Sequence, residues 1–180
     1  MALRDTPADY GKISQILHWL IATLIMTMSV IGVTLAIIEK SIGRTTLLTV
    51  HIGVGGVLSV LILIRIVWKA GNVTPNPPDG LSPLHVLGFR LTHIFLNSVA
   101  IALVASGIIM ALNWGMDILP IKTIAGIYIG RSTVFYFHIL MFTFLMGLIG
   151  GHVGGVIIYQ VTKSDVLSRM GLTWFNKSEE

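Results

Sequence analysis

Four long apolar runs constrain this chain more than any other feature of its sequence. They cover about residues 13–38, 47–69, 91–112 and 133–160. A run of about 20 apolar residues forms an α-helix long enough to cross the hydrocarbon core of a bilayer. Of the 180 residues, 54% are hydrophobic and only 11% are charged, so lipid must be the solvent for most of the chain. We therefore predict an all-α integral membrane protein, a four-transmembrane-helix bundle that forms a single domain over residues 1–180.

The distribution of Lys and Arg predicts the orientation of this bundle. With four helices, both termini and the Pro- and Gly-rich loop after the second helix lie on one side of the membrane. That side carries eight of the basic residues and the opposite side four: Arg4, Lys12, Arg65, Lys69, Arg90, Lys163, Arg169 and Lys177 against Lys40, Arg44, Lys122 and Arg131. Because basic residues accumulate on the cytoplasmic side, we expect cytoplasmic N- and C-termini. The net charge of +4 is thereby explained without nucleic acid as a partner.

The chain contains no cysteine. It therefore cannot form a disulfide, a thiolate zinc site, an iron–sulfur cluster or the thioether attachment of a c-type haem. Any redox centre must be held by histidine or methionine.

Histidines are the informative polar residues. Five histidines lie in or at the ends of the apolar runs: His18, His51, His93, His138 and His152. The sixth, His85, is predicted to lie in the loop after the second run. An ionisable residue inside a membrane span is costly, so it is expected to have a partner or a function. His138 and His152 are fourteen residues apart, a rotation about 40° short of four full turns and a rise of about 21 Å. The two rings thus leave one helix face near opposite sides of the membrane, which predicts two cofactor sites.

Depth in the membrane assigns each of these rings a partner. His18 lies early in the first run, at the depth of His152, and His51 lies early in the second, at the depth of His138. Haem iron with two axial imidazoles needs two histidines from different helices at one depth. We predict two haem b groups, with His18, His51, His138 and His152 as the axial ligands of the haem iron.

Glycines next to two of these histidines, in HIGVGG and GGHVGGV, would let a flat macrocycle approach the helix backbone, or would only let helices pack closely. Interhelical hydrogen bonds and a histidine proton relay remain alternatives for the histidines. A zinc or copper cage is disfavoured, because the histidines form separated pairs and the spans contain no carboxylate.

At these residues the sequence resembles the bacterial cytochrome b561 family, which is related to the cytochrome b subunits of nickel–iron hydrogenases and formate dehydrogenases. The resemblance runs from about Tyr10 to Gln160 and is carried by several segments: Tyr10 followed by LHWL, HIGVGGVLSVLILIRIVWK, the stretch from His93 to Gly107, and the His138 to His152 spacing. It implies the same four haem ligands and a place in the bacterial inner membrane. Compact members resemble superoxide oxidases, which implies ubiquinone as the electron acceptor.

An iron with two histidine ligands has no open position, so outer-sphere electron transfer is expected. The surplus His93 could donate a hydrogen bond and a proton to quinone, with Arg90 nearby and Asn97 on the same helix face. A contact to a haem propionate or an interhelical bond is the alternative for His93. Where many relatives of the family have a second histidine, this chain has Arg90.

Two functions follow from these expectations. In the first, the chain is an enzyme that moves electrons between a periplasmic donor, such as superoxide, and the membrane quinone pool. In the second, it is a membrane anchor that accepts electrons from a partner dehydrogenase or hydrogenase subunit. A haem-free histidine transporter is a third and more remote reading.

Overall fold

The described part of the chain consists of four long helices and one short 3-10 turn. The computed structural model describes residues 2–78, 80–113, 131–162 and 165–172. The elements in chain order are α1 (Lys12–Ile37), α2 (Ile42–Ala70), α3 (Pro83–Asn113), α4 (Arg131–Thr162) and η1 (Ser168–Met170). Each of the four helices is long and apolar enough to cross a membrane. The predicted all-α membrane bundle is therefore confirmed.

The helix boundaries differ most from the apolar runs at the starts of α2 and α3. Helix α2 begins at Ile42 because the Ser41 hydroxyl caps it, accepting a hydrogen bond from the Arg44 backbone N–H at 3.2 Å. Helix α3 begins at Pro83, where the Ser82 carbonyl accepts from the Val86 N–H at 3.0 Å. Proline at the first helical position favours this start. The assignment of His85 to a loop was therefore wrong, since His85 lies in the first turn of α3.

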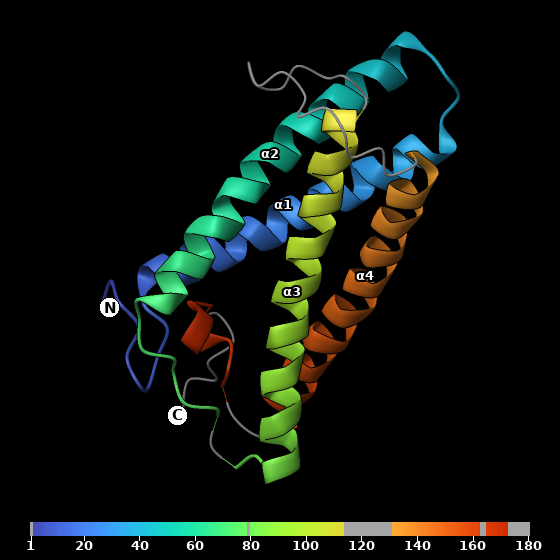
Figure 1. Cartoon of the computed structure of the whole chain (residues 1–180). Coiled ribbons are helices and arrows are strands. Elements are labelled where there is room, and N and C mark those ends of the chain that lie inside the picture. Colours follow the sequence, from blue (N-terminus) through green and yellow to red (C-terminus); the bar gives the residue numbers. More distant parts are fainter. Residues whose placement is uncertain (1, 79, 114–130, 163–164, 173–180) are drawn as a thin grey trace.

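The helices pack as two antiparallel hairpins, α1 with α2 and α3 with α4, joined by contacts between α2 and α3 (Figure 1). The buried core lies midway along the bundle and consists of Ile21, Leu58, Ile62, Val99, Ala100 and Leu145. Leu145 of α4 is the most enclosed of these residues, with 1% of its surface exposed. The outer faces are apolar and open, as for Val67 at 73% exposure, and contact lipid in the membrane.

The proximal end of the bundle, where α1 begins and α2 ends, is covered by three segments that we call the terminal cap: residues 2–11, 72–78 and 165–172. Figure 1 shows the N-terminal segment and η1 side by side at this end. Arg169 joins all three segments, because its Nε donates to the Ala8 carbonyl at 3.0 Å and its Nη2 to the Asn76 carbonyl at 2.8 Å. Burial in the cap raises the pKa of the Tyr10 phenol above its ordinary value, although the Arg169 charge opposes this effect.

Trp114, Pro120 and Tyr128 in the sequence between α3 and α4 predict a segment that lies in the membrane interface. Residues 114–130 lie outside the described part of the structure, so this expectation stays a prediction.

Candidate functional site

Each helix carries two residues, fourteen positions apart, that lie at two levels of the bundle. Fourteen residues bring the chain back to within about 40° of the same helix face after a rise of about 21 Å. We call the level nearer the termini the proximal layer and the other the distal layer. The proximal layer consists of His18, Arg65, His93 and His152, and the distal layer of Gly32, His51, Gly107 and His138. Midway between them, seven residues from each, lie Leu58, Ala100 and Leu145 of the core, with Ile25 packed against it.

In the distal layer, one hydroxyl group fixes the ring of His138. Ser106 of α3 is buried, with 2% of its surface exposed, and its Oγ donates to the Leu103 carbonyl at 2.7 Å. The same Oγ lies 2.8 Å from His138 Nδ1. Because the hydroxyl proton is already given to Leu103, His138 Nδ1 carries a proton and donates it to Ser106. The lone pair of His138 is therefore on Nε2, the state in which an imidazole binds a metal.

Two glycines lie against the distal rings. A Cβ at Gly107 would lie 3.3 Å from His138 Cε1, and a Cβ at Gly32 would lie 3.5 Å from His51 Cε1. A side chain at Gly107 would force the ring to move by a few tenths of an ångström, so glycine sets the position of His138. His51 and His138 are close enough for their charges to interact. Within the described chain, His51 Nδ1 is buried and has no hydrogen-bond partner.

The proximal layer brings three imidazoles and one guanidinium together. The rings of His93 and His152 meet edge to face, with centroids 5.0 Å apart and planes at 85°. His93 Nδ1 lies 2.7 Å from the Phe89 carbonyl and must donate to it, which leaves His93 Nε2 as the acceptor nitrogen. His18 is close enough to His152 and His93 for electrostatic interaction, and its Nδ1 lies 3.4 Å from Arg65 Nη2.

The other residues predicted for the quinone site lie on α3 beside His93. The Asn97 amide donates to the His93 carbonyl at 2.6 Å, so this donor is engaged within its own helix. Arg90 is exposed. His85 lies about two helical turns before His93. It is exposed, and its Nδ1 lies 2.7 Å from Ser82 Oγ.

Most glycines of HIGVGG and GGHVGGV lie on open helix faces. Apart from its chain neighbours and the backbone of its own helix, a Cβ at Gly53, Gly56, Gly150, Gly151, Gly154 or Gly155 would meet no described atom within 4 Å, whereas one at Gly55 would lie 3.4 Å from Met28 Cε. Close helix packing within the described chain therefore does not explain most of these glycines. Their approach to a macrocycle stays a prediction.

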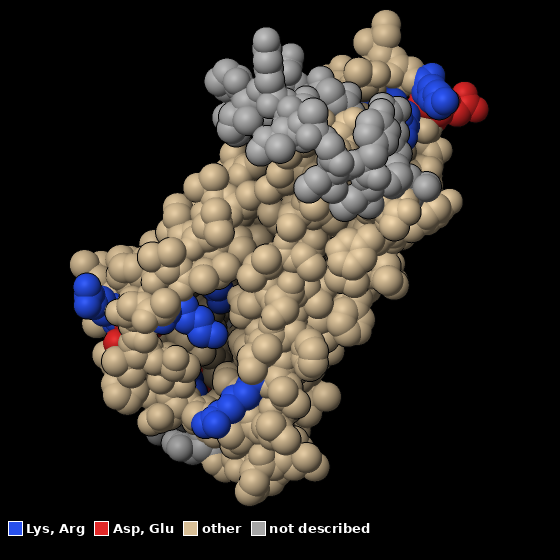
Figure 2. Space-filling model, viewed as in Figure 1, with Lys and Arg blue, Asp and Glu red and all other residues tan. Residues whose placement is uncertain are grey.

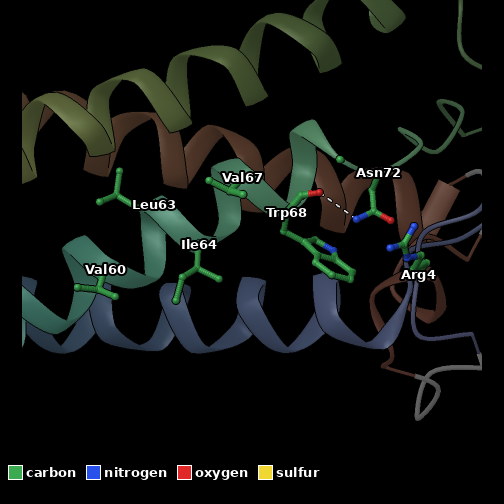
Figure 3. A pocket seen from close by; sticks show the side chains of 8 residues that line it. Arg4, Val60, Leu63, Ile64, Val67, Trp68 and Asn72 are labelled. Atoms are coloured by element: carbon green, nitrogen blue, oxygen red, sulfur yellow. Dashed lines mark hydrogen bonds between the residues drawn. The ribbon is translucent and has the colours of Figure 1, made fainter.

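A shallow apolar groove on the outer face of α2 is separate from both layers. Val60, Leu63, Ile64 and Val67 line its length, and Arg4, Trp68, Gly71 and Asn72 lie at its proximal end (Figure 3). The Asn72 amide donates to the Trp68 carbonyl at 2.9 Å. No histidine lines this groove, and its aliphatic residues face lipid.

Sequence reasoning missed Ser106, Gly107 and Gly32 as neighbours of the histidine rings, and it counted Arg65 only as a flanking charge. A simple signal identifies three of them. Counting fourteen residues on from His18, His51 and His93 leads to Gly32, Arg65 and Gly107. Ser106 precedes the last of these and is a polar residue within an apolar run.

Imidazoles at two depths between apolar spanning helices are the arrangement expected of a membrane cytochrome, in which helices of a bundle hold haem between them. Among the described residues, no group of three or more His, Asp or Glu side chains could form a metal cage.

The family model described as prokaryotic cytochrome b561 matches residues 9–172. Cytochrome b561 homolog 2 of Escherichia coli (strain K12) is 30% identical over 121 residues, which are 66% of this chain and 63% of that relative. The match thus spans less than two thirds of the relative's length. The chain belongs to the prokaryotic cytochrome b561 family, whose members are membrane b-type cytochromes that bind haem b and act in electron transfer.

Proposed function

We propose that this single-domain protein binds two haem b groups and passes electrons between a periplasmic donor and the quinone pool of the bacterial inner membrane. His18 and His152 would be the axial ligands in the proximal layer, and His51 and His138 those in the distal layer. The observation that carries the proposal is the pair of layers, fourteen residues apart on all four helices, with imidazoles from different helices in each. Haem supplies reversible one-electron exchange when it is bound between two imidazoles.

The described residues fit this group. His51 Nδ1 is a buried polar atom without a hydrogen-bond partner in the described chain, and Gly32 and Gly107 leave the sides of the distal rings free of Cβ atoms. Ser106 holds His138 in the tautomer with a free Nε2 lone pair. The apolar middle layer around Leu145 lies between the two levels.

The proximal layer supports a quinone site at His93. Its Nδ1 proton is committed to the Phe89 carbonyl, so the ring is held beside His152 with its Nε2 available. A protonated Nε2 would donate to a quinone carbonyl and then supply the proton needed on reduction. Arg90, exposed on the same helix, adds positive charge, while Asn97 holds the carbonyl of the His93 turn. Ubiquinone is the expected acceptor.

The sidedness of this proposal follows from charge. Arg4, Lys12, Lys69, Arg90 and Arg169 lie at the proximal end, against Lys40, Arg44 and Arg131, the first residue of α4, at the distal end. Figure 2 shows the charged side chains gathered at the two ends of the molecule, with a broad uncharged surface between them. The proximal end with both termini would be cytoplasmic. The donor, for which superoxide is the candidate, would then react at the distal, periplasmic end.

A haem count per chain tests the proposal. The purified protein should show a b-type spectrum on dithionite reduction and contain two haems, and His138→Ala and His152→Ala should each retain one. His85→Ala is the matched control and should retain two, because His85 is exposed in the first turn of α3. A colourless wild-type protein, or two haems in His138→Ala, would overturn the assignment.

The quinone site is tested separately with His93→Ala. We expect both haems to remain while superoxide-dependent reduction of ubiquinone slows about a hundredfold, the low end of the contribution of a positioned proton donor. Unchanged ubiquinone reduction would exclude His93 from the site. A redox subunit that copurifies in stoichiometric amount would instead assign the anchor function.

A further inference from the structure

Arg65 is a half-buried cation that forms no ion pair with an acidic side chain of the described chain. It lies within a membrane-spanning helix, in the proximal layer, and its one short contact is from Nη2 to His18 Nδ1 at 3.4 Å. Among the described residues the only ion pair joins Arg169 and Asp9. A charge inside a membrane protein is costly unless a partner compensates it. Arg65 is therefore a residue that requires an anionic ligand.

The surroundings of Arg65 increase this requirement. Tyr10 and Asp5 are the groups of opposite sign that act on Arg65, and Asp5 does not form an ion pair with it. The two Asp5 oxygens accept hydrogen bonds from the Gly11 N–H at 2.7 Å and the Ser14 hydroxyl at 2.8 Å. On the other side the charge of Lys69 also acts on the proximal layer, at His93. Figure 2 shows Lys and Arg side chains around a recess at this end of the molecule.

The contact between Arg65 and His18 is incompatible with His18 as an Nε2 ligand. A guanidinium can only donate, so His18 Nδ1 is the acceptor here and the ring proton resides on Nε2. Binding iron through Nε2 moves that proton to Nδ1, where it would face the donors of Arg65. His138 has no such conflict, because its Nδ1 already donates to Ser106. When His18 becomes a ligand, Arg65 must exchange His18 for another acceptor.

We propose that this acceptor is a carboxylate of the haem in the proximal layer, so that Arg65 binds a haem propionate and raises the midpoint potential of that haem alone. The inference rests on the proposed function, because it requires haem between His18 and His152. A nearby positive charge favours the reduced iron, which carries one positive charge fewer. A guanidinium also matches a carboxylate in shape and in hydrogen bonding.

Optical redox titration of the purified holoprotein tests this assignment. Arg65→Gln should shift one of the two midpoint potentials to more negative values, and Arg65→Lys should shift the same one by less. The matched control is Lys12→Gln, which removes one positive charge from an exposed site at the same end of the bundle. It should leave both potentials unchanged. The resonance Raman band of propionate bending should move in both Arg65 variants.

The outcomes separate this inference from the proposed function. A wild-type protein without haem refutes the proposed function and this inference with it. Two haems with unchanged potentials and an unchanged Raman band in Arg65→Gln refute this inference only. Equal shifts in Arg65→Gln and Lys12→Gln refute it too, because they would indicate a long-range charge effect. If Arg65→Gln does not fold, the Raman band of Arg65→Lys decides, and an unmoved band counts against propionate binding.

Discussion

Replacing Ser106 by alanine should loosen the haem of the distal layer. The Ser106 hydroxyl is the acceptor for His138 Nδ1–H at 2.8 Å in an enclosed site, with 2% of Ser106 exposed. Its loss leaves a buried N–H without an acceptor, at a cost of about 1–3 kcal/mol. Outer partners of metal-binding histidines contribute about 10–100-fold to metal affinity. The two ranges overlap, so we expect distal haem affinity to fall about 10–100-fold while the proximal haem is unaffected.

Transfer of haem from the detergent-solubilised protein to excess apomyoglobin measures this effect as two phases in the Soret band. In Ser106→Ala one phase should become faster and the other should keep its wild-type rate. Ser98→Ala is the control, because Ser98 lies on the same helix but is exposed. Two wild-type phases in Ser106→Ala would refute the reasoning that this hydroxyl orients His138.

Two further substitutions test the packing and the terminal cap. Leu145→Ala removes the most enclosed core side chain, and we expect the free energy of unfolding of the solubilised protein to fall by about 2–3 kcal/mol. Leu140 is 59% exposed, so Leu140→Ala should change it little. Equal melting temperatures of the two variants would contradict this expectation. Arg169→Ala removes two charge-assisted hydrogen bonds, whereas Asp9→Asn removes only the charge of Asp9 from its 3.9 Å ion pair with Arg169. Hydrogen exchange over residues 2–11 should therefore accelerate in Arg169→Ala and not in Asp9→Asn.

The four-helix fold could be predicted because the length and hydropathy of each helix can be read from its own sequence segment. The helix boundaries could not be predicted as well, since Ser41 and the Ser82–Pro83 pair lie outside the apolar runs and determine the helix starts through local capping. Hydropathy does not reflect these capping contacts. For this reason His85 was predicted to lie in a loop, although it lies in the first turn of α3.

The histidines of the candidate site stood out because ionisable residues are rare inside a membrane span. Ser106 and Gly107 did not, since small residues in such a helix are ordinarily read as packing positions. Their role depends on which face of α3 meets His138 of α4, a relation between two helices that neither sequence segment contains. The role of the four histidines as haem ligands stays a prediction that the haem count will test.

The seven-residue steps from layer to layer limit how the lengths of these helices can change. One inserted residue between Leu145 and His152 would turn the proximal ring by about 100° and displace it by about 1.5 Å, which takes it off the interior face. Seven inserted residues would restore the face to within about 20° and add about 10 Å of height. A homologue with a thicker bundle is thus expected to differ by whole pairs of turns, added to all four helices together.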